Sequence, residues 1–244
     1  MEKDFYSYTY HFIPKQKKNR LLIFHQGHIN GLNELGGNDL INKYLDNGFD
    51  VIGIAMPSFN GNNGPVFNHN KIMEMENESF NPIKIFLEPV SISLNYLLTN
   101  NSFKDITMVG ISGGGWTTTI YSAIDGRINN SVSIADSLPH YLRYFEDLGD
   151  AEQYEHLGIY RITDFLKLYI LDSVGNDRKH LQILNQFDSC CFKSDRREIE
   201  YEFTIKKRVD HIGNGFFDVI IDNSHHEHKI SQFALSEIDK LLEN

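Results

Sequence analysis

The chain has 244 residues, of which 41% are hydrophobic, 12% aromatic and 23% charged. This composition is typical of a soluble globular protein and excludes disorder as the main state of the chain. The formal net charge of −10 argues against a nucleic-acid or anionic-membrane partner, because either would need clustered lysines and arginines. We expect one domain spanning residues 1–244.

The predicted elements alternate between strands and helices along the chain. Strands are expected at 5–13, 21–24, 50–55, 106–109, 131–135, 181–185 and 216–221. Helices are expected at 40–45, 82–98, 116–123, 165–171, 195–209 and 232–242, the last capped by Ser231. Continuous apolar runs are typical of strands buried on both faces of a parallel sheet. The pattern therefore predicts one α/β domain with a mostly parallel sheet, and the aperiodic, aromatic-rich segment 138–162 is interpreted as an insertion over it.

Two adjacent cysteines, Cys190 and Cys191, are the only cysteines of the chain. Because neighbouring cysteines strain to bond each other, we expect no disulfide framework, which suits a reducing compartment. The N-terminal residues are charged and lack the apolar stretch of a secretory signal, and no run reaches the ~18 apolar residues of a membrane span. We therefore expect a cytoplasmic protein with no membrane partner and leave its oligomeric state open.

The strongest chemical signal is Gly110-x-Ser112-x-Gly114, between a predicted strand and a predicted helix. This is the pattern of a nucleophile elbow, whose tight turn leaves no room for side chains two residues before and after the nucleophile. The helix N-terminus there favours developing negative charge. Ser112 is the predicted nucleophile. The alternative is a helix N-terminus that binds a phosphate or is merely capped.

A nucleophilic serine needs a base, which in this chain order should follow the last strand. Three histidines lie there: His225, His226 and His228. A turn of about three residues after the strand favours His226, with His228 as the alternate base and His225 third. The same His-His-x-His run offers nitrogen ligands, but it lacks the spacing of a helical zinc site. We expect neither a metal nor a cofactor.

The acid that orients the base should follow the preceding strand, at the carboxyl edge of the sheet. Asp188 follows the strand 181–185 and meets this condition, whereas Asp177 precedes that strand and belongs at the opposite edge. Asp136, which follows the strand 131–135, is the fallback.

An oxyanion hole needs two backbone N–H donors. One is expected from Gly113, the residue after the nucleophile, and the other from the loop 25–31 after an early strand. In that loop Gly27 lets the backbone approach, and His28 or Gln26 would donate its N–H group. The alternative is an ordinary structural role for this loop.

The chain resembles the α/β-hydrolase fold superfamily over nearly its whole length. The resemblance rests on the loop His25-Gln26-Gly27-His28, the elbow around Ser112, Asp188 and the late histidines, in that order. The run 110–116 is similar to that of uncharacterised or prolyl-peptidase-like bacterial members. Three late histidines instead of one, and Gln26 in the oxyanion loop, depart from the pattern. The superfamily implies an eight-stranded, mostly parallel sheet with its second strand antiparallel and helices on both faces. The insertion 138–162 would then follow strand 6 as a cap or lid.

The expected function is that of a serine hydrolase cleaving a carboxylic ester of a small molecule. Ser112 would attack the carbonyl carbon, His226 would take its proton, and Asp188 would hold the imidazole. An acyl-enzyme would form and be released by water. The alternatives are an acyltransferase with the same triad and a non-catalytic binding protein on this fold, since the fold does not fix the chemistry.

Overall fold

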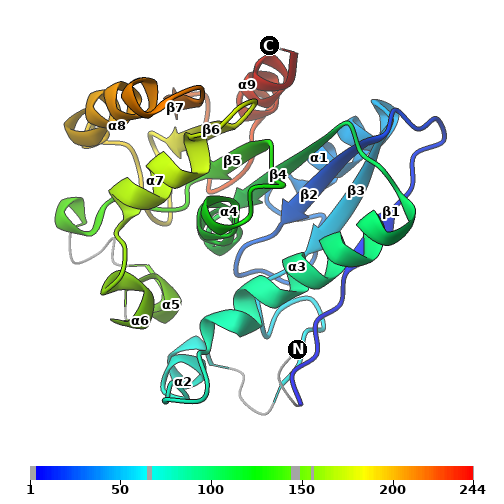
Figure 1. Ribbon diagram of the computed structural model, residues 1–244, viewed down its shortest axis with the longest axis horizontal. Coiled ribbons are helices and arrows are strands. Elements are labelled where there is room, and N and C mark those ends of the chain that lie inside the picture. Colours follow the sequence, from blue (N-terminus) through cyan, green and yellow to red (C-terminus); the bar gives the residue numbers. More distant parts are fainter. Residues whose placement is uncertain (1–3, 65–67, 144–148, 155–156, 244) are drawn as a thin grey trace.

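The computed structural model describes residues 4–64, 68–143, 149–154 and 157–243, which form a central sheet covered by helices on both faces (Figure 1). The strands are β1 (Tyr10–Phe12), β2 (Arg20–His25), β3 (Phe49–Ile54), β4 (Asp105–Ile111), β5 (Asn130–Ile134), β6 (Lys179–Asn185) and β7 (Phe216–Asp222). Their order across the sheet is β1-β3-β2-β4-β5-β6-β7. The strand β1 pairs antiparallel with β3, and every other neighbouring pair is parallel.

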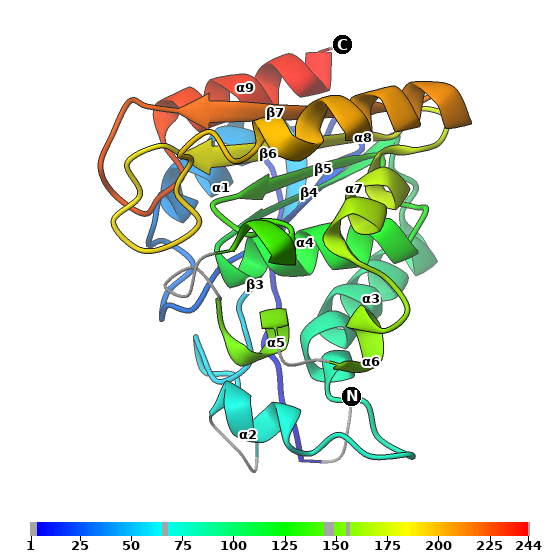
Figure 2. The ribbon, with the colours of Figure 1, turned by 90° about the vertical axis from the view of Figure 1, so that its left-hand side faces the viewer.

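The helices divide between the two faces of the sheet, as the edge-on view in Figure 2 shows. They are α1 (Gly37–Asp46), α2 (His69–Met73), α3 (Ile83–Asn100), α4 (Gly113–Ile124), the 3-10 turn η1 (His140–Leu142), α5 (Ala151–Tyr154), α6 (Leu157–Tyr160), α7 (Phe165–Ser173), α8 (Ile199–Ile212) and α9 (Gln232–Glu243). Side chains of α1 and α9 pack on one face, and those of α3, α4, α7 and α8 pack on the other. No helix in the described ranges is long and apolar enough to cross a membrane.

The sequence predicts the ends of the parallel strands to within two residues. The resemblance implies eight strands, whereas the described part of the chain forms seven. Each of the seven strands expected from the sequence has a counterpart, so the superfamily's eighth strand is the one without a counterpart in the described residues. The largest difference in strand length lies at the N-terminus. The predicted edge strand 5–13 is reduced to β1, and Tyr6 forms only an isolated bridge with Asn63. Tyr6 and Tyr8 are largely exposed, so little apolar burial holds this segment in a regular strand. The segment 138–162 consequently follows β5.

The strand β2 shows why its sequence is continuously apolar. Leu21 and Ile23 pack with the cluster around α3, whereas Leu22 and Phe24 pack with the cluster around α1 and α9. All four side chains are completely buried. Because successive side chains of a strand point to opposite faces, a strand covered by helices on both sides needs an apolar residue at every position.

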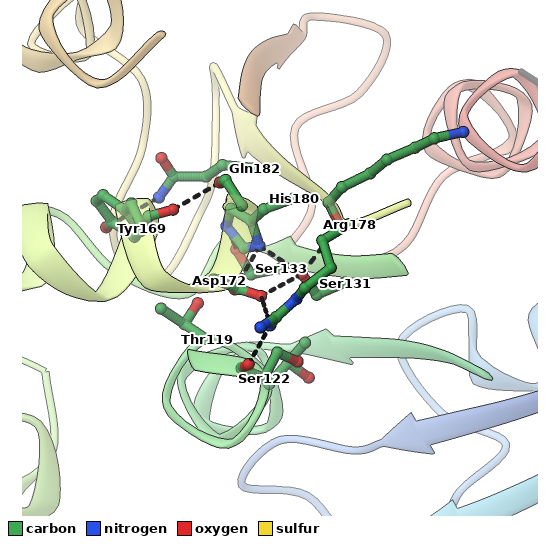
Figure 3. A network of polar contacts seen from close by, with 12 residues as sticks. Thr119, Ser122, Ser131, Ser133, Tyr169, Asp172, Arg178, His180 and Gln182 are labelled. Carbon is green, nitrogen blue, oxygen red and sulfur yellow. Dashed lines mark hydrogen bonds and ion pairs between the residues drawn. The ribbon is translucent and has the colours of Figure 1, made fainter. Parts of the chain in front are cut away.

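A buried polar network crosses the amino ends of β5 and β6 (Figure 3). His180 Nδ1 lies 2.7 Å from Asp172 Oδ2 and 2.9 Å from Ser131 Oγ, which donates to Asp172 Oδ1 at 2.6 Å. Arg178 lies 3.9 Å from Asp172 and donates to the carbonyl of Ser122. Ser131, His180 and Asp172 are at most 1% exposed. The network therefore has the residue types of a catalytic triad but no access for a substrate.

We predict that Asp172→Ala lowers the free energy of unfolding by about 3–5 kcal/mol, because it leaves a buried histidine without its acidic partner. Urea denaturation followed by circular dichroism measures the change. Asp210→Ala, an exposed position on α8, is the control and should stay within ~0.5 kcal/mol of the parent. Equal stability of the two variants would contradict a structural role for this network.

Candidate active site

Ser112 stands at a tight turn between β4 and α4, with φ 57° and ψ −130°. This is a sparsely populated backbone conformation for a residue with a side chain, and such strain concentrates at functional sites. A Cβ atom on Gly110 would collide with the backbone of Gly114, and one on Gly114 would collide with the carbonyl of His25. Both flanking glycines of the predicted elbow are thus required by close backbone packing.

Asp188 and His228 meet at the carboxyl edge of the sheet. His228 Nδ1 lies 2.8 Å from Asp188 Oδ2 and 3.0 Å from Oδ1. Asp188 is 8% exposed and stands in the turn after β6, as the sequence predicts. His228 Nε2 is buried and has no hydrogen-bond partner among the described residues. This nitrogen is therefore free to accept a proton.

The surroundings of Asp188 favour its ionised form. Its Oδ1 accepts the backbone N–H groups of Cys190 at 2.7 Å and Cys191 at 3.2 Å, and its Oδ2 accepts Asn185 Nδ2 at 3.1 Å. Burial by itself raises the pKa of Asp188, but the hydrogen bond and charge of His228, together with the two backbone donors, outweigh it and lower the pKa. A carboxylate held in this way can orient an imidazole and stabilise its protonated form.

The other two late histidines lie elsewhere. The ring of His226, the first choice for the base, is exposed and stacks on Phe187 with ring centroids 4.7 Å apart. His225 Nε2 lies 3.2 Å from Asp222 Oδ2. Of the three candidates, the alternate base His228 is the one that contacts Asp188. Beside His228, Asn185 at the end of β6 also donates to the carbonyl of Lys229 at 3.2 Å.

No hydrogen bond joins Ser112 Oγ to His228 within the described ranges. Catalytic hydrogen bonds are often long before substrate binds and tighten only in the reacting complex. Ser112 is partly exposed, unlike its flanking residues Ile111 and Gly113. Ser112 and the Asp188–His228 pair thus belong to the same candidate site without a direct hydrogen bond between them among the described residues.

The loop after β2 passes directly over Ser112. A Cβ atom on Gly27 would lie 2.7 Å from Ser112 Cβ and 3.2 Å from its Oγ, so a side chain there would displace the serine. Gln26, an unexpected residue in this loop, explains its shape. Its Oε1 accepts the N–H of Gly27 at 3.0 Å, and its Nε2 donates to the carbonyls of Gly31 and Glu34.

The structure limits which backbone N–H groups are available for the expected oxyanion hole. The backbone N–H of Gln26 donates to the carbonyl of Ile54 at 2.8 Å, and that of Gly27 is occupied by Gln26. Of the two candidate donors in this loop, Gln26 and His28, the backbone N–H of His28 therefore remains as the candidate for the oxyanion hole. The N–H of Gly113 is in the first turn of α4, where backbone donors have no partner within the helix.

The rejected acids have other roles. Asp136 is completely buried and interacts with Ser137, Thr119 and Gln182 rather than with a late histidine. Burial raises the pKa of Asp136, and these hydrogen bonds only partly oppose the shift. Asp177 is exposed with φ 58°, in the turn before β6, and therefore lies at the amino edge.

The expectation for the cysteines is wrong in one respect, because Cys190 and Cys191 are joined by a disulfide. The bond links neighbours in the chain, so it closes no long loop and is no framework for the fold. The two cysteines contact the site through their backbone, since both donate their N–H groups to Asp188.

A second polar cluster beside the elbow escapes sequence reasoning. His28 Nε2 and His69 Nδ1 each lie 2.9 Å from a different oxygen of Glu152, which is completely buried. Burial raises the pKa of Glu152, but the hydrogen bonds from His28 and His69 outweigh it and lower the pKa to about 2. Burial likewise lowers the pKa of His69, but the hydrogen bond and charge of Glu152 outweigh it, so the pKa is raised. No local motif joins these residues, which come from three separate segments.

The insertion 138–162 contributes α5 and α6, while residues 144–148 and 155–156 lie outside the described residues. Glu152 of α5 holds His28, and the Tyr160 hydroxyl accepts Trp116 Nε1 of α4 at 3.2 Å. The described part of the insertion thus contacts both the oxyanion loop and the helix behind the nucleophile.

Comparison with solved structures identifies the architecture. Est1E from Butyrivibrio proteoclasticus matches with a TM-score of 0.63 and 13% identity, over 99% of this chain and 97% of its own. The esterase Pf2001 of Pyrococcus furiosus matches with a TM-score of 0.59 and 13% identity, over 98% and 90%. Acetyl xylan esterase 1 from Thermoanaerobacterium sp. matches with a TM-score of 0.59 and 20% identity, over 97% and 78%.

No known family profile and no curated protein sequence matches the chain. The structural matches are α/β-hydrolase fold proteins, and the chain therefore has the α/β-hydrolase fold, as its sequence predicts. At identities of 13–20%, the likeness establishes the fold, while the chemistry must be argued from the site.

His25, at the end of β2, generates a prediction on acid stability. Burial lowers the pKa of His25 to about 4, with a hydrogen bond to the Gln26 carbonyl opposing and the charge of His28 adding to the shift. The unfolded chain binds this proton near pH 6.5, so its contribution to stability is fully present above pH 6.5 and is lost as the pH falls towards 4. We expect a loss of about 3 kcal/mol from this residue across that window.

Urea denaturation at several pH values tests this assignment. In His25→Gln, whose amide can still donate to the Gln26 carbonyl, the fall in unfolding free energy between pH 6.5 and 4 should be smaller by about the same amount. The exposed His211→Gln is the control and should keep the parent's slope. An unchanged slope in His25→Gln would refute the assignment.

Proposed function

We propose that this protein is a serine hydrolase that cleaves a carboxylic ester of a small molecule. The observation that carries the proposal is the Asp188–His228 pair with a free, buried Nε2, at the same sheet edge as the strained Ser112 elbow. Names of structural neighbours support the ester class, since they include esterases and an acetyl xylan esterase. Est1E has also been studied with bound ferulic acid.

The proposed reaction begins with Ser112 Oγ attacking the ester carbonyl carbon while His228 Nε2 takes the hydroxyl proton. Asp188 keeps the Nδ1–H tautomer of His228 and stabilises the imidazolium. The backbone N–H groups of Gly113 and His28 stabilise the oxyanion, with the α4 dipole adding to the field. The imidazolium returns its proton to the leaving alcohol, which yields an acyl-enzyme.

Water then completes the cycle. His228 takes a proton from the water as it attacks the acyl carbon, and it returns the proton to Ser112 Oγ as the acid leaves. His228 thus replaces His226 as the proposed base, because His226 stacks on Phe187 instead of contacting Asp188. We further propose a single catalytic domain in which 138–162 is the lid, which the contacts of Glu152 with His28 support.

We predict that a fluorophosphonate adds one adduct to the folded protein and none to Ser112→Ala. Intact mass spectrometry measures the adduct. Hydrolysis of p-nitrophenyl acetate by Ser112→Ala should fall at least ~1,000-fold in kcat, because no other group forms the acyl-enzyme. Ser79→Ala, an exposed serine, is the control. Failure of the folded wild-type chain to react would favour the non-catalytic binding alternative.

We predict a clear separation between the two candidate bases. His228→Ala should lower kcat by ~1,000-fold or more, whereas His226→Ala should stay within a few-fold, because the contact that orients the imidazole is made to His228. Asp188→Asn should lose ~10,000-fold by disturbing the tautomer of His228. Steady-state kinetics on the same ester measure all three. The reverse ranking of the two histidines would restore His226 as the base.

A further inference from the structure

His28, His69 and Glu152 bring three donor atoms together from three segments. His28 belongs to the loop after β2, His69 begins α2, and Glu152 lies in α5. His28 Nε2 and His69 Nδ1 are 3.2 Å apart, and each is 2.9 Å from an oxygen of Glu152. Glu152 is completely buried, and the side chains of His69 and His28 are 9% and 18% exposed. The three potential ligand atoms thus lie close together in a place with little exposure to solvent.

The ring nitrogens that point away from Glu152 indicate the tautomer of each histidine, and therefore which inner nitrogens carry a lone pair. His69 Nε2 lies 3.0 Å from the carbonyl of Pro57, and a carbonyl oxygen only accepts, so this nitrogen carries a hydrogen. His28 Nδ1 lies 3.2 Å from Asp150 Oδ2, and the negative oxygen favours a hydrogen on this nitrogen as well. In neutral imidazoles the inner nitrogens are then unprotonated. Two lone pairs and a carboxylate facing one another attract a cation, which can be a proton on an imidazole, as in the hydrogen bonds to Glu152 described above, or a metal ion.

We propose that His28 Nε2, His69 Nδ1 and a Glu152 carboxylate oxygen bind a divalent metal ion of the Zn²⁺ class. A tetrahedral zinc ion with bonds of ~2.0–2.1 Å separates its ligand atoms by about 3.3 Å, close to the 3.2 Å between the two histidine nitrogens. The two oxygens of Glu152 lie 2.9 Å from one of these nitrogens each, and one ligand atom from each of the three residues lies within 4.8 Å of the others. Two imidazoles and a carboxylate are an established zinc ligand set. Three protein ligands leave a fourth position for water or another small ligand.

The surroundings match those of a metal centre. Metal-bound histidines donate their remaining ring N–H group to a carbonyl or carboxylate. His69 forms such a hydrogen bond with the Pro57 carbonyl, and His28 Nδ1 has the Asp150 carboxylate 3.2 Å away. Aromatic rings form an apolar shell, with Phe59 5.6 Å from the His28 ring and Phe86 5.2 Å from the His69 ring. Such a shell strengthens the attraction between a cation and its ligands.

The site would fix the geometry beside the nucleophile. His28 packs against Gly113, where a Cβ atom would lie 2.8 Å from His28 Nδ1. A metal ion on His28 would therefore tie the oxyanion loop to α2 and α5, the second of which belongs to the proposed lid. This role is positional, and metal binding can be measured without any substrate, so it stands apart from the proposed hydrolysis.

A second donor group competes for the same assignment. Cys190, Cys191 and His228 also hold three possible ligand atoms within 4.8 Å of one another. The two cysteines are bonded to each other, and His228 Nδ1 faces Asp188. His28 and His69 have neither a disulfide nor a contact with Asp188, so we favour the cluster of His28, His69 and Glu152 as the metal site. The experiment below also tests the cysteine group.

The test is zinc binding by the full chain after treatment with a chelator. Calorimetric titration with ZnCl₂, and atomic spectrometry after gel filtration, should give one zinc per wild-type chain, together with a higher Tm. His69→Ala and Glu152→Gln should weaken binding at least ~100-fold, and Asp150→Asn, at a 55% exposed position, should weaken it ~10-fold. His211→Ala is the matched control and should bind as the wild type does.

Two results would overturn the proposal. One is a folded wild-type chain that takes up no zinc and shows no change in Tm. The other is stoichiometric zinc that survives Asp150→Asn, His69→Ala and Glu152→Gln unweakened but is lost in the Cys190→Ser/Cys191→Ser double variant, which would assign the ion to the cysteines. Should the buried variants fail to fold, the wild-type titration and the exposed Asp150→Asn still decide between these outcomes.

Discussion

The close approach of three backbone segments at Ser112 is the constraint on which the rest of the site depends. The carboxyl ends of β2 and β4 lie side by side because the two strands pair in parallel, with His25 opposite Gly110. The helix α4 can begin at that edge only because Gly114 has no side chain to meet the His25 carbonyl. Gly27 then passes over Ser112 for the same reason. Ser112, the loop after β2 and the N-terminus of α4 thus meet at one closely packed junction.

Features that repeat along the chain could be predicted from the sequence. Apolar runs locate the buried strands because residues such as Leu21 and Leu22 must both be buried, on opposite faces. Chain direction in a parallel sheet separates Asp188, after β6, from Asp177, before it. The N-terminal edge was less predictable, since Tyr6 and Tyr8 alternate as a strand would but bury too little to form one.

Features set by tertiary contacts could not be predicted. The choice between His226 and His228 depends on the path of an aperiodic loop, which is held by contacts such as that of Asn185 with the Lys229 carbonyl and that of Ser224 with Asp222. The cluster of His28, His69 and Glu152 joins residues 41 and 83 positions apart in the chain, and no spacing rule connects them. Gln26 departs from the family pattern for a reason visible only in three dimensions, because its side chain holds the oxyanion loop.

Two serine–histidine–aspartate groupings among the described residues show that the same residue types can play different chemical roles. Ser131, His180 and Asp172 contact one another at the amino edge, out of reach of solvent. In the other grouping, Asp188 orients His228, but His228 Nε2 has no partner among the described residues and Ser112 is partly exposed in a strained turn. In the enclosed network the polar groups face one another, which fits the structural role predicted for it. The other grouping keeps its capacity to exchange a proton, which is the property that a reacting site needs.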